Sequence, residues 1–293
     1  MTAAAAEKTP WTIESLVKWA TDDFRTRGIE NPRLDAEVLV AWALGIDRVR
    51  IIVDGKRPLM GEELGKLREL VKRRRAREPV AYLRGEREFY GRRFMVDKRV
   101  LVPRPDTETL VDVALNRTAH ASLGLRGLDL CTGSGCVAIT LARQRPTVHI
   151  HATDISEDAL AVARTNAHRL GAYKVSFSAG DLFDAKLPWP QFDLITANPP
   201  YIASAEMDTL PPDIKDFEPR IALDGGNDGL DLVRRIVDLA PRYLRTEGVL
   251  ALEIGCDEGA ATTQLFEARG FRDVLVTRDY GKLERVVSGI WQG

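Results

Sequence analysis

The spacing of hydrophobic residues changes partway along the chain. Up to residue 75 they recur every three or four positions, the period of an amphipathic helix, and Gly28 and Gly45 close two of the runs. The predicted helices cover about 12–27, 33–45 and 61–75, with a short segment at 47–53. We therefore expect the chain to begin with a small helical unit.

From residue 126 onward, short apolar runs typical of buried strands alternate with longer helical patterns. The predicted strands are 127–131, 148–153, 175–179, 192–197, 249–254, 273–277 and 285–290, and the predicted helices are 136–143, 157–170, 230–244 and 260–269. Such a series predicts an α/β domain with a mostly parallel sheet, right-handed crossovers and helices on both faces. The last two strands should be neighbours around a turn at Tyr280 and Gly281.

Between these two regions, alternating residues around Gly91 predict a β-hairpin at 88–96. Residues 100–102 read as another short strand, and 105–108 open a helix with acidic residues in its first turn. The chain is thus expected to divide into a helical domain (1–80), a hairpin connector (81–108) and the α/β domain (109–293).

Composition weighs against several classes of protein. The 293 residues carry 42 basic and 43 acidic side chains, a formal net charge of −1, which weighs against a phosphate-backbone partner. The dense basic run, 72–75 with Arg77, is interpreted as a solvated helix C-terminus rather than a contact surface for a macromolecule. Three cysteines and four histidines show no ligand spacing, so no metal site is expected.

The first residues lack the basic and long apolar regions of a signal peptide, and no stretch approaches the ~20 apolar residues of a transmembrane helix. We therefore expect a soluble, cytoplasmic protein that acts without a membrane.

Polar residues at successive strand ends predict a nucleoside site. The sequence DLCTGSG at 129–135 follows one strand, Asp154 ends the next, and Asp181 follows the third. Glycines let the backbone approach a ligand closely, and an acidic residue at the second strand end suits ribose hydroxyls. Asp181 suits an adenine amino group, and S-adenosylmethionine fits because a third, dinucleotide-type glycine is missing. The cofactor residues predicted from this pattern are Asp129, Cys131, Thr132, Gly133, Ser134, Gly135, Asp154 and Asp181.

The fourth strand ends in Asn198, Pro199, Pro200 and Tyr201, which we predict to be the catalytic residues. The Asn198 side-chain oxygen and a backbone carbonyl are able to accept both N–H bonds of a planar NH₂ group. The two prolines would hold these acceptors in place, and Tyr201 would offer an aromatic face. The chemistry that suits them is methyl transfer to a weakly basic nitrogen, although a strand-ending Asn-Pro is also a common loop signal.

These segments resemble the protein-(glutamine-N5) methyltransferases of the peptide-chain-release-factor type, from about Glu78 to the C-terminus. The matching stretches are 77–85, 88–91, 100–108, 129–135, 198–201, 217–220 and 279–281. The resemblance implies a Rossmann-like class I S-adenosylmethionine methyltransferase sheet, with an N-terminal helical domain that recognises the substrate. It also implies methylation of the glutamine in the Gly-Gly-Gln motif of bacterial class 1 release factors, with no direct nucleic-acid partner.

Three alternatives remain at this point. Cys131 to Cys136 resembles the sister enzymes that methylate a large-subunit ribosomal protein, whereas 104–108 and the C-terminal segment resemble the release-factor subgroup. The resemblance also implies that Leu182 and Asn198 contact the cofactor, although Leu182 stands where some relatives have an aromatic residue. A nucleic-acid amino-methyltransferase faces the same NH₂ chemistry on a flipped base, and a non-catalytic protein could keep the fold and pocket.

Overall fold

The computed structural model describes residues 10–120 and 124–293. The chain forms two compact units, Met1–Gly85 and Glu86–Gly293. The hairpin belongs to the second unit, and the three-part division at residues 80 and 108 stays a prediction. Within the described ranges, every helix is too short or too polar to cross a bilayer.

The first unit is helical, as its hydrophobic period predicts. Its helices are α1 (Ile13–Thr26), α2 (Pro32–Leu44), α3 (Arg48–Val53), α4 (Gly61–Arg75) and α5 (Val80–Arg84). Thr12 and Ser15 form a capping box that fixes the start of α1. A core of aliphatic side chains around Phe24 and Leu39 joins the helices.

The basic run at the end of α4 is not simply solvated. Arg74 is 5% exposed and its guanidinium lies 2.8 Å from the Asp35 carboxylate. Arg75 pairs with Asp23, and Arg73 pairs with Glu78. These arginines therefore connect α4 to α1, to α2 and to the turn that follows α4. A local run of basic residues in the sequence does not reveal such distant partners.

The second unit opens with the predicted hairpin, β1 (Glu86–Phe89) and β2 (Arg92–Met95), which pair antiparallel around Tyr90 and Gly91. The strand predicted at 100–102 is wrong, because these residues pair with no strand. Val100 and Val102 are buried, so the apolar run reflects burial in a connecting segment rather than β pairing.

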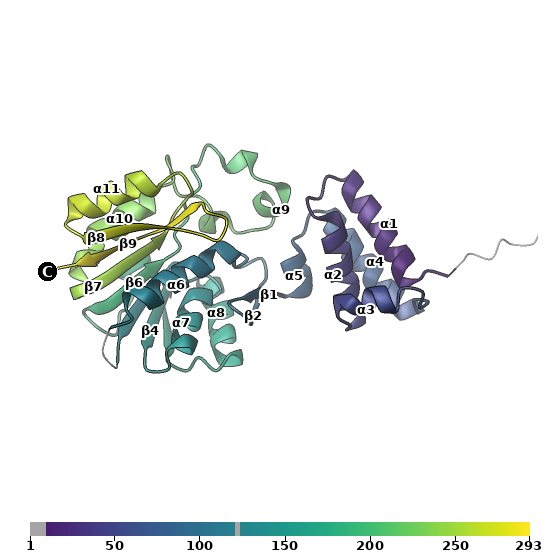
Figure 1. The fold of residues 1–293 in the computed structure, drawn as a ribbon, viewed down its shortest axis with the longest axis horizontal. Helices are drawn as coiled ribbons and strands as arrows, with labels where there is room; N and C mark the ends of the chain where they lie inside the picture. Colours follow the sequence, from purple (N-terminus) through teal and green to yellow (C-terminus); the bar gives the residue numbers. More distant parts are fainter. Residues whose placement is uncertain (1–9, 121–123) are drawn as a thin grey trace, which may run out of the picture. The chain divides into compact units, whose positions relative to one another are not determined.

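A seven-stranded sheet forms the centre of this unit, with the order β5-β4-β3-β6-β7-β9-β8 (Figure 1). Its strands are β3 (Arg126–Leu130), β4 (His149–Asp154), β5 (Val175–Ala179), β6 (Phe192–Ala197), β7 (Leu244–Glu253), β8 (Arg272–Arg278) and β9 (Glu284–Trp291). The first five in this order run parallel, and β9 is antiparallel to both of its neighbours. The mostly parallel sheet with a C-terminal strand pair is confirmed.

Helices cover both faces of the sheet, as predicted. They are α6 (Glu108–Arg117), α7 (Cys136–Gln144) and α8 (Glu157–Arg169) on one face, with α10 (Asp231–Leu239) and α11 (Gly259–Arg269) on the other; a short α9 (Pro212–Lys215) lies in the loop after β6. Two predicted boundaries are wrong. Strand β7 begins at Leu244 rather than 249, because its polar first residues hide the strand period, and the helix predicted to reach 244 ends at Leu239.

Parallel strands bring their carboxyl ends to one edge of the sheet, where α/β proteins bind ligands. Leu130, Asp154 and Ala197 end β3, β4 and β6 there, and Glu253 ends β7. The residues that follow these positions build the cavity described next.

Candidate active site

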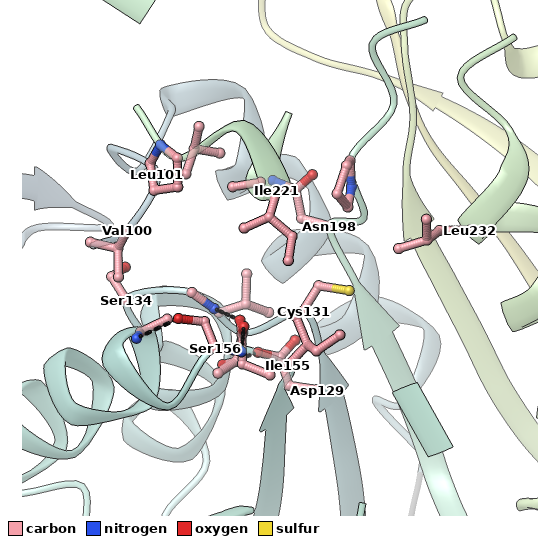
Figure 2. Close-up of a pocket in the computed structure, with 18 of the residues that line it drawn as sticks. Val100, Leu101, Asp129, Cys131, Ser134, Ile155, Ser156, Asn198, Ile221 and Leu232 are labelled. Atoms are coloured by element: carbon pink, nitrogen blue, oxygen red, sulfur yellow. Dashed lines mark hydrogen bonds between the residues drawn. The ribbon is translucent and has the colours of Figure 1, made fainter. Parts of the chain in front are cut away.

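A cavity of about 530 Å³ opens at this edge of the sheet. In Figure 2, Val100 and Leu101 lie on one side of it, Leu232 lies on the opposite side, and Asn198 and Ile221 lie between them. Ten predicted residues line it: Asp129, Cys131, Thr132, Gly133, Ser134, Asp154, Asp181, Leu182, Asn198 and Pro200. Gly135, Pro199 and Tyr201 are not among its lining residues.

The glycine turn between β3 and α7 requires glycine at two positions for different reasons. Gly133 has φ +54° and its N–H donates to Asp154 Oδ2 (2.8 Å). Gly135 has φ +80°, and a side chain there would meet Ile139 at 2.8 Å and Ala163 at 3.2 Å. Gly135 thus shapes the turn from behind, which explains why it does not face the cavity.

Asp154 joins the ends of two strands. Its second oxygen, Oδ1, accepts from the Ser156 backbone N–H at 2.9 Å. Burial raises the pKa of this carboxyl, and the backbone N–H donors of Ser156 and Gly133 oppose the rise. Each carboxylate oxygen has two acceptor positions, so both still have room for one hydroxyl donor from a ligand.

Asp129 lines the cavity, but its carboxylate is occupied. Oδ2 accepts from the Thr132 hydroxyl (2.6 Å) and Oδ1 from the Thr196 hydroxyl (2.7 Å). The side chain is 2% exposed, and burial raises its pKa to about 6. Asp129 therefore braces the turn against β6.

At the third strand end, the Asp181 carboxylate lies 2.8 Å from the guanidinium of Arg235 on α10. The next residue, Leu182, is buried and has φ +52°. Cys131 also has a positive φ, and burial together with the carboxylate of Asp154 raises the pKa of its thiol. The thiol is accordingly a neutral part of the wall.

Asn198 directly follows β6, with its side chain partly buried in the cavity wall (Figure 2). Its Nδ2 donates to Thr107 Oγ1 at 3.3 Å, so Oδ1 is left to accept from a ligand. Tyr201 is largely buried, and burial with the nearby Glu253 carboxylate raises its pKa to about 12. Its hydroxyl is therefore neutral at physiological pH.

The segment after α9 holds the backbone of Pro200 and Tyr201 in place. A side chain on Gly225 would lie 2.7 Å from the Pro200 carbonyl oxygen, and one on Gly229 would lie 2.4 Å from the Tyr201 carbonyl oxygen. The Gly225 N–H also donates to Ile202 O at 2.8 Å. These glycines let two loops pack closely enough to fix the residues after Asn198.

Some site residues escaped the sequence analysis. Arg104 lines the cavity and forms hydrogen bonds of 2.7 and 2.8 Å with both oxygens of the buried Glu218. This pair anchors the loop that carries Ile221 to the segment before α6. The two residues are 114 positions apart, and only their occurrence in two family-like segments hinted at a shared role.

Asn166 on α8 is fully buried and joins the hairpin to the glycine turn. Its Oδ1 accepts from Met95 N, and its Nδ2 donates to the carbonyl oxygens of Met95 and Ser134. No motif marks this residue. The one signal in the sequence is that Asn166 is polar, although the residues one helical turn before it on the same face of α8 are apolar.

Replacing Asn166 with alanine should lower the free energy of unfolding by about 3 kcal/mol, because buried backbone groups that lose a partner cost ~1–3 kcal/mol each. Urea unfolding followed by circular dichroism measures the change. Thr165→Ala, at an exposed position of the same helix, is the matched control and should change stability by less than ~0.5 kcal/mol. Equal stability of the two variants would contradict the role given to Asn166.

Comparison with known proteins agrees with this architecture. Residues 15–85 match the family described as PrmC N-terminal domain, and residues 122–251 match a methyltransferase domain. The chain is 43% identical to a release factor glutamine methyltransferase from Geobacter sulfurreducens, over 95% of this chain and 96% of that protein. It is 40% identical to one from Chlorobaculum tepidum, over 96% and 98%. The crystal structure of a methyltransferase from Pyrococcus furiosus shares the fold, with a TM-score of 0.53 and 16% identity over 80% of this chain and all of that one.

Proposed function

The chain belongs to the release factor glutamine methyltransferases, and on this premise we propose that it transfers a methyl group from S-adenosylmethionine to the side-chain nitrogen N5 of a glutamine in bacterial class 1 peptide chain release factors. The glutamine is that of the Gly-Gly-Gln motif. A cytoplasmic location goes with such a substrate. The observation that carries the proposal is Asn198 at the end of β6, with its amide nitrogen held by Thr107 and its oxygen left for a substrate.

The cavity fits the proposed cofactor. Its walls combine apolar side chains, such as Ile155 and Leu232, with the Asp154 carboxylate. Asp154 would accept ribose hydroxyls while keeping its bonds to the glycine turn, and Asp181 with Leu182 would border the base. When bound, S-adenosylmethionine supplies an electrophilic methyl group on a sulfonium.

Toward the substrate, Asn198 Oδ1 and the Pro199 carbonyl would accept the two N–H bonds of the glutamine amide. This orients the nitrogen in line with the methyl group and favours the charge that develops on N–H as amide resonance is lost. Tyr201 and the two prolines would keep this geometry rigid before the substrate binds. The methylated amide then releases its proton to water.

We also propose that the helical unit recognises the release factor. Its short helix α3 exposes the apolar side chains of Val49, Ile52 and Val53, with Ile52 79% exposed. Exposed apolar patches of this kind on a helical surface commonly mark protein contacts. A protein substrate rather than nucleic acid suits the apolar character of this surface.

Incubating the protein with S-adenosylmethionine and, in parallel, a class 1 release factor, a large-subunit ribosomal protein and duplex DNA tests the function. We expect one added methyl group on the release factor, located to the glutamine of its Gly-Gly-Gln motif by tandem mass spectrometry. Heat-denatured enzyme is the control. Methylation of the ribosomal protein or the DNA in preference to the release factor would contradict the proposal.

A further inference from the structure

Glu253 ends β7 beside the residue that is proposed to hold the substrate. Strands β6 and β7 run parallel, with Ala197 opposite Leu252, so Asn198 and Glu253 leave the sheet at the same level. Ala197 and Leu252 belong to the core on the side of α10 and α11. Since successive side chains alternate, Asn198 and Glu253 both turn to the face covered by α6.

Thr107, the residue before α6, connects the two side chains. Its hydroxyl accepts the hydrogen bond from Asn198 Nδ2. The Glu253 carboxylate lies near enough to Thr107 for this side chain to lower the pKa of the carboxyl as a hydrogen-bond partner. A threonine hydroxyl has one proton to give and is able to accept at the same time. When Glu253 is ionised it can only accept, so Asn198 Nδ2 donates to the Thr107 hydroxyl and the Thr107 hydroxyl donates to Glu253. The three side chains then form a hydrogen-bond series with a single direction.

The carboxylate has little other reason to lie there. Glu253 is 1% exposed, and within the described residues its Oε2 has no hydrogen-bond partner. Arg285 and Arg104 face it and favour its charge, but Arg285 pairs with Asp279 and Arg104 with Glu218. Asp106, Tyr201 and Cys136 also lie near enough to interact electrostatically. Burying an ionisable group at such a position is costly, and a methionine or leucine would serve packing better.

We propose that Glu253 is a positioning residue for the methyl transfer, because its carboxylate takes the Thr107 proton and so obliges Asn198 to turn its side-chain oxygen toward the substrate amide. The inference rests on the proposed function and adds the group that sets the direction of the Asn198 amide. Glu253 is not among the residues that line the cavity, so it would act through Thr107 and Asn198 without touching substrate or cofactor.

Protonation of Glu253 should reverse the direction of both hydrogen bonds in this series. The neutral acid would donate to Thr107, Thr107 would donate to Asn198 Oδ1, and Nδ2 would then face the N–H bonds of the substrate. Burial raises the pKa of Glu253 to about 7, against the Thr107 hydrogen bond that lowers it. Activity needs the ionised form, so kcat should fall as the pH drops through about 7 and level off above it.

The test measures the single-turnover rate constant of methyl transfer to a release factor, taken here as kcat, from pH 5.5 to 9. The proteins compared are wild type, Glu253→Gln, Thr107→Val and Thr107→Ser. We expect kcat at pH 8 to fall about 10- to 100-fold in Glu253→Gln and Thr107→Val, the loss typical of a misplaced reactive group. Glu253→Gln should lose the inflection near pH 7, and Thr107→Ser should stay near wild type. The dissociation constant of S-adenosylmethionine should change little throughout.

Thr109→Val is the matched control, since Thr109 is a buried threonine two residues further along and its hydroxyl has no partner in the described structure. It should keep the wild-type kcat and pH profile. Wild-type kcat in Glu253→Gln and Thr107→Val overturns the inference, and so does an inflection near pH 7 that persists in Glu253→Gln. If Glu253→Gln does not fold, the two Thr107 variants decide the question. A loss of kcat in Thr107→Val alone supports the inference, and an equal loss of kcat in Thr107→Val and Thr107→Ser overturns it. A wild-type enzyme that leaves the release factor unmethylated would instead mean that the proposed function fails.

Discussion

Replacing Asn198 with alanine should lower kcat by about 10²- to 10³-fold, the range measured when a preorganised hydrogen-bonding group at a reacting centre is removed. The Asn198 oxygen is proposed to act on the substrate amide, and its Nδ2 is already engaged by Thr107. Affinity for S-adenosylmethionine should change less than about threefold, because Asp154 and the glycine turn would carry cofactor binding. Single-turnover mass spectrometry and isothermal titration measure the two quantities separately.

The control for this substitution is Asn116→Ala, at an exposed asparagine on α6, which should behave as wild type. If Asn198→Ala abolished cofactor binding while single-turnover chemistry on the remaining complex was normal, Asn198 would be a cofactor residue and the proposed substrate contact would be wrong.

Much of the framework could be predicted from local patterns. Strands β3, β4 and β6 are short and buried over most of their length, so their ends are visible in the sequence. Once these ends are known, a parallel sheet must place the residues after them along one edge, which is how Asp154 and Asn198 came to be grouped. The cavity lies at that edge. The roles of the individual residues stay predictions.

The remaining features depend on partners that are distant in sequence. In the sequence, Glu253 lies at the end of a predicted strand and Thr107 lies at the start of a predicted helix. Only the register between β6 and β7 and the packing of α6 bring these two residues close to Asn198. Arg104 and Glu218 likewise meet only in the folded chain. The incorrect prediction of a strand at 100–102 has the same cause. An apolar run indicates that the residues are buried, but it does not show whether another strand is there to pair with their backbone.

Asp154→Ala should weaken S-adenosylmethionine binding by about 10²- to 10⁴-fold while leaving kcat at saturating cofactor within about tenfold. The substitution would remove two proposed ribose contacts, and hydrogen bonds to charged groups contribute ~1.5–3 kcal/mol each, where 1.4 kcal/mol is a tenfold change in affinity. It would also release the Gly133 and Ser156 N–H groups that the carboxylate holds. Titration calorimetry with S-adenosylmethionine measures the loss.

Two further variants locate the cause of that loss. Asp158→Ala changes an exposed acid in the first turn of α8 and should bind the cofactor as wild type does, which controls for net charge. Asp154→Asn keeps the size but replaces one acceptor oxygen with a donor that would face a backbone N–H, so it should bind nearly as weakly as Asp154→Ala. If Asp154→Asn instead bound with wild-type affinity, the negative charge and the second acceptor would be dispensable, and the assignment of Asp154 to the ribose would have to be abandoned. Measuring all three at low and at high ionic strength separates this specific contact from the long-range field of the neighbouring carboxylates, because salt screens the latter far more strongly than a buried hydrogen bond.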